Sequence, residues 1–559
     1  MTTPAPQRAA SHALAAIAAA AVCGGCGGAR GVGRLRFENQ PPVTLVNDRR
    51  PIAPPDFRQQ GLVEYYFHEE MSRPLVGALT LSRPRPAADV NSLGEVPDSS
   101  WFTNRIGVRD LSPAEVRHGP GRGGGPDRSG PWRVDGVKVG GAAIGFKIHD
   151  ARGDRYIIKF DERDHPETES SADVLVQRLV WAFGYNVPEN EVVEVECDRL
   201  VLAKGATFKN QGGDERPMTQ ADLDRYVGLV RPPSGRCRVM SSRLVDGTPV
   251  GGFPPEGVRR DDPNDTVAHE DRRALRGQRL LFAWFDHTDV KTQNTLSVYD
   301  PRRRALVHYV LDFGKSLGMF ARVDGLIYVG YRTSWGLSSS LKSLVSLGLW
   351  VPPWERRASA PSLRGVGFFD AGTFDPATWT PHHRWLPFDR ADRFDDYWAA
   401  AIILKIGPAH VHAAVEAAHY TDPSAAAYVE RILLERRQKL LRWALSRVAP
   451  FDAFAARGGE RLSLCFDDLW VRHRFGREGE THYRAVTHDF DGIRLGHRDA
   501  WPRAGARVCL TGLVPGRSHA GYTIVRLSAR RGSDEVPDLY VHLARNRRGE
   551  LAVIGIDRR

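Results

Sequence analysis

Cysteine is scarce in this chain, with six residues among 559. So few cysteines exclude the densely disulfide-bonded scaffold found in small secreted domains. Cys465 and Cys509 both fall in a C-terminal β-region, where they either form a disulfide or remain buried thiols. Cys23 and Cys26 have CxxC spacing, but their glycine-rich setting argues against a metal or redox site.

Long hydrophobic runs are also missing. The apolar stretch Ala13–Val22 is too short to span a bilayer but suits the core of a signal peptide. Arg8 precedes it, and Gly24-Gly25-Cys26 follows, which resembles the cleavage and acylation site of a bacterial lipoprotein. Residues 1–26 therefore predict a lipoprotein-type signal peptide. The mature chain is expected to be exported and anchored in the cell envelope, on the periplasmic or outer-membrane face, by a lipid on Cys26. An ordinary cleaved signal peptide and a disordered Ala-rich tail are the alternatives.

The net charge of +11 is not concentrated in one segment, because Lys and Arg are spread over the whole length of the chain. No groove-reading motif accompanies them, which argues against nucleic-acid binding and favours a generic basic surface facing anionic lipid or polysaccharide. Hydrophobic residues at 42% and charged residues at 26% are globular values and exclude general disorder. A chain of this length is expected to form two or three domains.

The first region after the signal peptide has few periodic stretches. Residues 27–130 are rich in Pro, Gly and Arg and predict an N-terminal extension and linker. Within it, Ser112-Pro-Ala-Glu115 predicts a short helix, because it combines a capping box with Pro at the first helical position. The run Gly119–Pro126 is expected to be flexible.

Regular structure is predicted for the rest of the chain. Residues 131–245 contain a predicted β-hairpin at 144–160, then a helix at 169–183 and further strands. Residues 246–455 are predicted to be mostly helical, beginning with one helix over 269–285. Residues 460–559 show short apolar runs with Gly and Asp turns, typical of a small β-rich domain. The order predicts an α+β fold with a β-rich lobe, a helical lobe and a C-terminal β-domain.

One segment carries a recognisable chemical pattern. His287-Thr-Asp-Val-Lys-Thr-Gln-Asn294 is followed, after a predicted hairpin, by Asp312-Phe-Gly314. Phosphoryl transfer to a hydroxyl needs a carboxylate to accept the proton, oxygen ligands for Mg²⁺, and a positive charge near the phosphate. An Asp with an Asn five positions later, followed by Asp-Phe-Gly, resembles the catalytic loop of protein kinases, and this resemblance implies that Asp289 and Lys291 are catalytic residues and that Asn294 and the Asp of the triplet are metal ligands. At average residue usage, His-x-Asp-x₄-Asn arises by chance about once in 10⁴ start positions.

A lysine interrupts the apolar strand Tyr156–Phe160 and needs a partner. The same resemblance to protein kinases implies that this residue, Lys159, bridges the ATP phosphates and a carboxylate of the following helix. Glu169 and Asp173 form an i, i+4 pair on one face of that helix, and both remain candidates. The stretch with Gly140 and Gly141, just before the hairpin, is the expected phosphate-covering loop, although it lacks the full G-x-G-x-x-G pattern.

These residues resemble the core pattern of the protein-kinase-like superfamily. The matching residues are Lys159, His287, Asp289, Asn294 and Asp312. Trp181–Pro188 resembles the HipA-type branch, and Asp262–Asp265 with the His-Thr-Asp loop resembles a group of exported bacterial kinase-like proteins. The resemblance implies a bilobal fold that binds ATP and Mg²⁺, and it leaves the protein or small-molecule acceptor unnamed.

Two departures separate the chain from standard protein kinases. Thr288 stands where many of them have an Arg that pairs with a phosphorylated activation loop, and no Ala-Pro-Glu follows. Two functions therefore remain open: an active phosphotransferase, and an inactive pseudokinase-like lipoprotein that serves as a scaffold or binding protein. His382 and His383 are interpreted as a loop feature, because no matching Cys, His or Asp cluster accompanies them.

Overall fold

A computed structural model of the chain divides into two compact units. The larger comprises Pro42–Pro450 and Leu469–Gly476, and the smaller comprises the chain up to Pro41, Phe451–Asp468 and Arg477–Arg559. The structure describes residues 35–58, 61–73, 85–138, 143–209, 215–334, 342, 344–347, 349–356, 361–501 and 505–559. The predicted signal peptide with Cys23 and Cys26 lies outside the described residues, as do Gly140 and Gly141.

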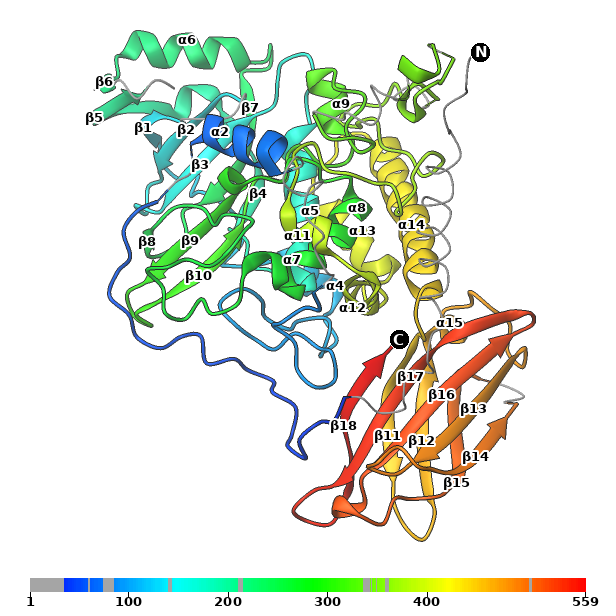
Figure 1. Ribbon diagram of the computed structural model, residues 1–559. Coiled ribbons are helices and arrows are strands. Elements are labelled where there is room, and N and C mark those ends of the chain that lie inside the picture. The colour runs from blue at the N-terminus through cyan, green and yellow to red at the C-terminus, as the bar shows by residue number, and fades with distance from the viewer. Residues whose placement is uncertain are drawn as a thin grey trace, which may run out of the picture. The chain divides into compact units, whose positions relative to one another are not determined.

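A seven-stranded sheet forms the β-rich part of the larger unit (Figure 1), in the order β4-β7-β3-β2-β1-β5-β6. Its strands are β1 (Trp132–Val137), β2 (Gly145–His149), β3 (Arg155–Phe160), β4 (Asn190–Glu196), β5 (Leu200–Lys209), β6 (Glu215–Pro217) and β7 (Arg236–Arg243). Strands β1 and β5 run parallel, and the other neighbours are antiparallel. The predicted hairpin is confirmed by the pairing of β2 with β3.

Two helices cover opposite faces of this sheet. In β7, Val239 belongs to a cluster with Leu223 and Val227 of α6 (Gln220–Val230), whereas the next residue, Met240, packs with Val174 of α5 (Glu169–Phe183). Because successive side chains of a strand point to opposite faces, α6 and α5 lie on different sides. The bounds of α5 are those predicted from the sequence.

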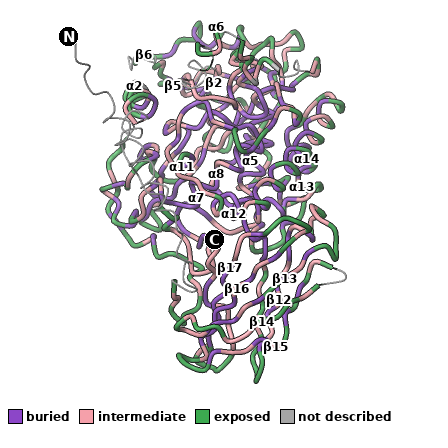
Figure 2. Tube along the Cα trace, turned by 45° about the vertical axis from the view of Figure 1, so that its right-hand side comes forward, coloured by how far each residue is buried: buried purple, intermediate pink, exposed green. Residues whose placement is uncertain are grey.

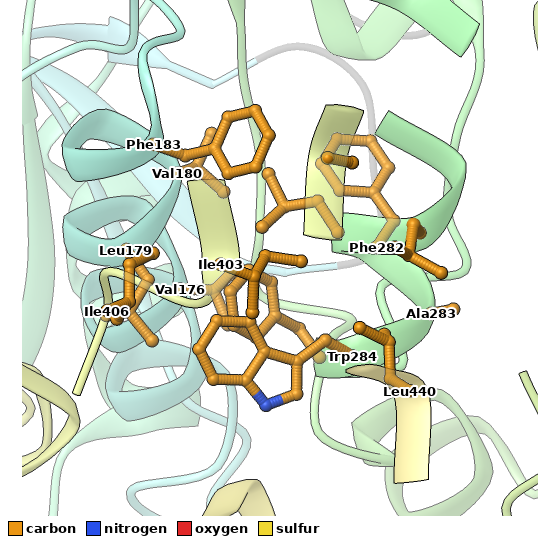
Figure 3. Packing of buried hydrophobic residues seen from close by; sticks show 14 of the residues in the cluster. Val176, Leu179, Val180, Phe183, Phe282, Ala283, Trp284, Ile403, Ile406 and Leu440 are labelled. Carbon is orange, nitrogen blue, oxygen red and sulfur yellow. The ribbon is translucent and has the colours of Figure 1, made fainter. Parts of the chain in front are cut away.

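Helix α5 also faces the helical part of the larger unit. Its apolar residues recur at helical spacing and meet Phe282, Trp284, Ile403 and Leu440 in one core (Figure 3). The helices on that side are α4 (Pro113–His118), α8 (Gln278–Phe285), α9 (Met319–Asp324), α11 (Leu386–Arg390), α12 (Arg393–Ile403), α13 (Pro408–Ala417) and α14 (Pro423–Ser446). A small sheet, β10-β9-β8, accompanies them, with β8 (Thr248–Pro249), β9 (Thr295–Asp300) and β10 (Ala305–Val310).

The single helix predicted over 269–285 is wrong. Three short pieces stand there: the 3₁₀ turn η3 (His269–Asp271), α7 (Arg273–Arg276) and α8. Arg272 has an extended backbone between the first two, with φ −87° and ψ 123°. At Gly277, between α7 and α8, the ring of Trp398 lies 2.4 Å from where a Cβ would stand, so only glycine fits.

The N-terminal extension is more ordered than its composition predicted. The predicted capping box at Ser112 is confirmed in α4. Trp101, Phe102, Ile106 and Val116 are buried in the main hydrophobic core of the larger unit. Tertiary burial of these aromatic and branched side chains holds a segment whose local sequence has little helical or strand periodicity.

The glycine run Gly119–Pro126 also differs from the expected flexible linker. The backbone amides of Arg122 and Gly123 donate to the buried carboxylate of Glu189, at 3.1 and 2.7 Å. The carbonyl of Gly125 accepts from Tyr156 at 3.3 Å. The glycines thus allow the backbone to approach these groups closely, with φ positive at Gly121 and Gly123–Gly125.

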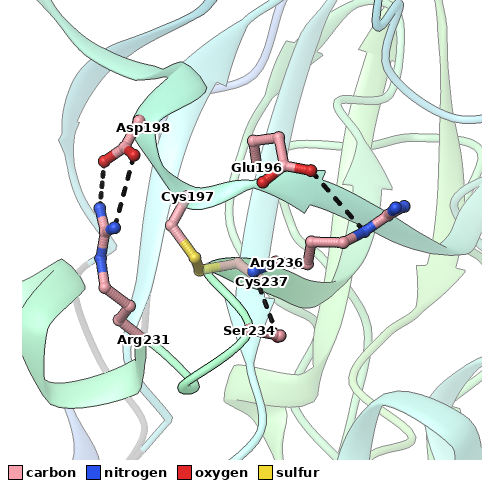
Figure 4. Close-up of a disulfide and its surroundings, with 7 residues drawn as sticks. All are labelled: Glu196, Cys197, Asp198, Arg231, Ser234, Arg236 and Cys237. Carbon is pink, nitrogen blue, oxygen red and sulfur yellow. Dashed lines mark hydrogen bonds and ion pairs between the residues drawn. A yellow bond between two sulfur atoms is a disulfide. The ribbon is translucent and has the colours of Figure 1, made fainter.

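A disulfide that the sequence did not predict joins Cys197 to Cys237 (Figure 4). Cys237 lies on β7, and Cys197 follows β4, the strand that pairs with β7. Ion pairs flank the disulfide, with Arg231 on Asp198 and Arg236 on Glu196. The bond ties the edge strand of the large sheet to its neighbour.

The smaller unit consists of two antiparallel sheets, β11-β12-β15 and β14-β13-β16-β17-β18. Its strands are β11 (Phe451–Arg457), β12 (Leu462–Asp468), β13 (Thr481–His488), β14 (Arg494–Ala500), β15 (Arg507–Leu513), β16 (Thr523–Arg531), β17 (Asp534–Arg545) and β18 (Leu551–Arg558). Cys465 and Cys509 stand opposite each other on β12 and β15 and form a disulfide. The first strand of this unit begins at Phe451, and the segment up to Pro41 belongs to the same unit.

Burial alternates along many of these strands, whereas the centre of the larger unit is continuously buried (Figure 2). Within the described ranges no single helix has the length and apolar composition to cross a membrane. One bent pair, α12 with α13 at an angle of 79°, meets both criteria when its two helices are taken together.

Candidate active site

The loop after α8 brings the predicted catalytic residues into the larger unit. Asp286, in the left-handed region with φ 53°, ends the helix. A 3₁₀ turn, η4 (Thr292–Asn294), leads into β9, and β10 returns antiparallel to it. The amide of Leu311 then donates to the carbonyl of Asn294 at 2.9 Å, which sets the Asp312 triplet beside the end of the loop.

Asp289, Lys291 and Asn294 form one hydrogen-bonded group. The Lys291 ammonium lies 2.8 and 2.9 Å from the two carboxylate oxygens of Asp289. Asn294 donates through Nδ2 to the carbonyl of Asp289 at 2.7 Å and to its Oδ2 at 3.0 Å. Burial acts to raise the pKa of Asp289, but the charge and hydrogen bond of Lys291, together with smaller contributions from neighbouring groups, lower it, so the carboxylate is ionised.

Lys159, predicted to need an acidic partner, has two. Its Nζ lies 2.7 Å from Asp312 Oδ1 and 4.0 Å from Asp173 Oδ2. The enclosed position would raise the pKa of Asp312, but Lys159 lowers it below its usual range. Asp173 is buried on α5 and accepts from Asn190 at 2.6 Å, and burial raises its pKa. The three residues come from separate elements and meet where β3, α5 and the segment after β10 converge.

Glu169, the other helix candidate, has a different partner. Its carboxylate forms an ion pair with Lys315, which also lies 2.5 Å from Asp324. The Cβ that Gly314 lacks would lie 3.3 Å from Glu169 Cβ, so this helix end packs directly on the Asp-Phe-Gly segment. The structure therefore selects Asp173 over Glu169 as the helix carboxylate that faces Lys159.

His287 holds the loop against that same segment. Its Nδ1 shares a hydrogen bond with Ser316 at 3.0 Å, and its ring lies 5.3 Å from that of Phe313. Burial lowers the pKa of His287 to about 4, so the imidazole is neutral near pH 7. His287 thus fixes the loop that carries Asp289 against the Asp312 triplet.

A second lysine, Lys138, lies at the site and was not predicted from the sequence. Lys138 directly follows β1, and its Nζ donates to the carbonyl of Ala143 at 3.4 Å. Burial lowers its pKa, with a further contribution from Lys159, while Asp312 and Glu169 oppose the shift. By the alternation of β1, Lys138 would share the face of Trp132 and Val134, which lie in the core, so no local pattern marked it as a site residue.

His383 lies in an irregular loop, as interpreted from the sequence, but the sequence did not predict that it lies beside Asp289. Its side chain is buried, and Nε2 lies 3.8 Å from Asp289 Oδ1. The same nitrogen lies 3.3 Å from the hydroxyl of Tyr66, in a helical segment more than 300 residues earlier. No local pattern predicts such a contact, because its partners are distant in sequence.

The donor set fits a divalent cation bound together with phosphate. Asp173 Oδ2 is buried without a hydrogen-bond partner, and Asn294 uses only its Nδ2 toward Asp289, which leaves its Oδ1 as an oxygen ligand. Among the described residues no cluster of three or more His, Cys, Asp or Glu side chains has the arrangement of a metal site. Phosphate oxygens would therefore complete the coordination that Asp312 and Asn294 begin.

Comparison with known proteins gives little beyond this geometry. No family model and no curated protein matches the chain. The kinase CtkA of Helicobacter pylori is similar in structure, at 10% identity and TM-score 0.29, over 55% of this chain and 92% of that one. Golgi casein kinase is similar at 10% identity and TM-score 0.28, over 57% of this chain and 74% of its own. The structure of Golgi casein kinase with Mn and ADP bound is similar at 10% identity and TM-score 0.27, over 56% of this chain and 72% of that one. TM-scores this low do not establish a shared fold, so the kinase-like interpretation rests on the residues of this chain.

Proposed function

We propose that the chain is an ATP- and Mg²⁺-dependent phosphotransferase of the protein-kinase-like type, with a β-rich lobe and a helical lobe enclosing its site. One observation carries the proposal. Lys159, Asp173 and Asp312 come from three separate elements and converge. Asn294 is hydrogen-bonded both to Leu311, the residue before Asp312, and to Asp289. The segment Trp181–Pro188 favours the HipA-type branch.

Each residue of the group suits one part of phosphoryl transfer. Asp312 and Asn294 would hold Mg²⁺, which would bridge the phosphates and neutralise their charge when bound. Lys159, oriented by Asp173, would bind the phosphates. Asp289 is an ionised carboxylate, so it can accept the proton of an acceptor hydroxyl, and Lys291 beside it meets the charge on the transferred group.

The test is nucleotide binding followed by transfer. Full-length protein should show a melting temperature that rises with ATP and Mg²⁺ and does not rise with either alone, because a ligand that binds only the folded state stabilises it. Labelled phosphate should then move from ATP to an acceptor in cell extract. If neither ATP, ADP nor GTP with Mg²⁺ moves the transition at millimolar concentration, the assignment of the site is wrong.

We also propose that the chain is exported and anchored through a lipid on Cys26. The two disulfides, Cys197–Cys237 and Cys465–Cys509, support export because disulfides persist in oxidising compartments. Cys26→Ser should move the protein from the membrane fraction to a soluble fraction, and Cys23→Ser should leave it in the membrane. Cytoplasmic full-length protein that keeps its N-terminus would contradict the proposal.

A second candidate, a non-catalytic envelope-binding protein, is favoured by a hollow on the smaller unit. It has a volume of about 640 Å³, and three arginines contribute to its lining: Arg484, Arg526 and Arg530. Asp538 neutralises Arg526 at 2.8 Å. Full-length protein that is retained on dextran sulfate, and that loses retention in Arg484→Ala/Arg530→Ala, would support this candidate. Mg·ATP binding without any transfer would support it further.

A further inference from the structure

A helical segment from the N-terminal region is docked beside the catalytic loop. It comprises α2 (Leu62–Tyr65) and the π-helical turn η1 (Tyr66–Ser72). The π-helical conformation is rare in proteins, and where it occurs it is often at a functional site. Two side chains of this segment form hydrogen bonds with the backbone of Arg384. The hydroxyl of Tyr65 donates to the carbonyl of Arg384 at 3.0 Å, and the amide of Arg384 donates to the carboxylate of Glu70 at 2.7 Å. The attachment is therefore specific.

This attachment places the hydroxyl of Tyr66 near the proposed catalytic residues. Tyr66 is half-buried, and its Oη shares a hydrogen bond with His383 Nε2 at 3.3 Å. The same nitrogen lies 3.8 Å from Asp289 Oδ1. Burial raises the pKa of Tyr66, and the charges of Lys291 and Asp289 both act on it, which agrees with close proximity to the catalytic group.

His383 is in a suitable state to link the two oxygens. Its side chain is 3% exposed, and burial, together with His382, lowers its pKa to about 3. The imidazole is therefore neutral near pH 7 and a weak base, so it can carry the hydroxyl proton only in passage to Asp289. Its Nδ1 has no hydrogen-bond partner and lies 3.8 Å from Glu70.

We propose that Tyr66 is an acceptor of the protein's own phosphotransfer, phosphorylated in cis by the site that contains Asp289. The proposal rests on the proposed function. Tyr66 Oη forms a bond to the γ-phosphorus of Mg·ATP, and the bond from that phosphorus to the β,γ-bridging oxygen breaks, so that ADP leaves with the electron pair. His383 Nε2 takes the hydroxyl proton and passes it to Asp289 Oδ1.

The modification also changes how the segment is held. A phosphate on Tyr66 adds close to two negative charges beside Asp289 and Glu70. Like charges at this distance repel, and the hydrogen bond to His383 is lost with the hydroxyl proton. The phosphorylated segment is therefore expected to leave the catalytic loop, which opens this side of Asp289 to another acceptor.

The experiment maps the phosphate on wild-type, full-length protein after incubation with Mg·ATP. Mass spectrometry should find phosphotyrosine at Tyr66, formed with a rate constant that does not depend on protein concentration. Tyr66→Phe should remove this site, and Asp289→Asn should reduce its formation by about 10²-fold or more. The matched control is Ser72→Ala in the same segment, whose exposed hydroxyl donates to the carbonyl of His68; it should keep the Tyr66 phosphate.

Failure of this inference differs from failure of the proposed function. Wild-type protein that phosphorylates extract proteins but carries no phosphate on Tyr66 overturns the inference and leaves the phosphotransferase intact. A rate that grows in proportion to protein concentration overturns the cis mechanism. Protein that binds no Mg·ATP and transfers no phosphate overturns both. The wild-type map decides the matter even where Tyr66→Phe folds poorly.

Discussion

Asp173 faces Lys159 from inside helix α5, with 4.0 Å between Oδ2 and Nζ. One turn earlier on the same helix, Glu169 is bound to Lys315 instead. The two carboxylates are therefore not equivalent, although the sequence leaves both as candidates. Asp173 orients the lysine that would meet the phosphates, whereas Glu169 fastens the helix to the segment after Gly314.

This difference predicts different effects of two matched substitutions. Asp173→Asn should weaken Mg·ATP binding by about 10-fold, because Lys159 loses a charged partner and one pKa unit of interaction equals about 1.4 kcal/mol. Glu169→Gln should change nucleotide affinity less and reduce the melting temperature instead. Titration calorimetry and thermal unfolding on both variants separate the two effects. Equal losses of affinity would contradict the assignment.

The two disulfides predict separate losses of stability. Cys197→Ser/Cys237→Ser should reduce the free energy of unfolding of the larger unit by about 2–5 kcal/mol, and Cys465→Ser/Cys509→Ser should do the same for the smaller unit. Chemical denaturation followed in each unit should show two transitions that respond independently, because the pairs lie in different units. A wild-type protein that unfolds identically with and without reductant would contradict both bonds.

Glu69 predicts a pH dependence in the docked segment. Its side chain is 2% exposed, and burial raises its pKa to about 7, although Arg73 lies 3.1 Å away and opposes the shift. Between pH 4.5 and 7 the folded state keeps this proton while the unfolded state has lost it. The free energy of unfolding therefore falls as pH rises through that window. Above pH 7 this group causes no further change in the free energy of unfolding.

Glu69→Gln should remove that fall, because the amide does not titrate. The difference between wild type and variant should grow by about 1–3 kcal/mol from pH 5 to pH 8. The matched control is Glu64→Gln, an exposed carboxylate in the same segment. Thermal unfolding over this pH range checks the prediction, and parallel curves for wild type and Glu69→Gln would contradict it.

Much of the fold followed from local sequence. The hairpin of β2 and β3 and the bounds of α5 were predicted because alternation, helical spacing and the terminal Gly184 are all read within a few residues. The ordered glycine run Gly119–Pro126 was not, because it is held by Glu189, some 66 residues away. The requirement for glycine at position 277 depends equally on Trp398, in another helix.

Of the candidate site, too, only the part formed by one short stretch of chain was predicted from the sequence. The spacing of Asp289, Asn294 and the Asp-Phe-Gly triplet indicated a catalytic loop, because those residues act through one short stretch of chain. Tyr66 and His383 left no such signal, since their contact joins segments 317 residues apart. The choice between two carboxylates on one helix face likewise depended on how α5 sits on the sheet.

The last prediction divides the work of the two site aspartates. Asp312 pairs with Lys159 and would hold Mg²⁺, and through it the phosphates, in both the ground state and the transition state. Asp312→Ala should therefore weaken Mg²⁺-dependent nucleotide binding and transfer together. Asp289, held by Lys291 and Asn294, would act on the incoming hydroxyl, so it stabilises only the transition state.

Asp289→Asn should keep nucleotide affinity within about two-fold of wild type and reduce transfer by about 10²–10⁴-fold, the usual contribution of a general base. Binding is measured by the shift of melting temperature with Mg·ATP, and transfer by labelled phosphate in extract. Lys405→Gln, on the surface of the helical part, is the control that should leave both unchanged. An Asp289→Asn protein that transfers phosphate at the wild-type rate refutes the catalytic role, because no other described residue in the loop offers an ionised carboxylate at that position.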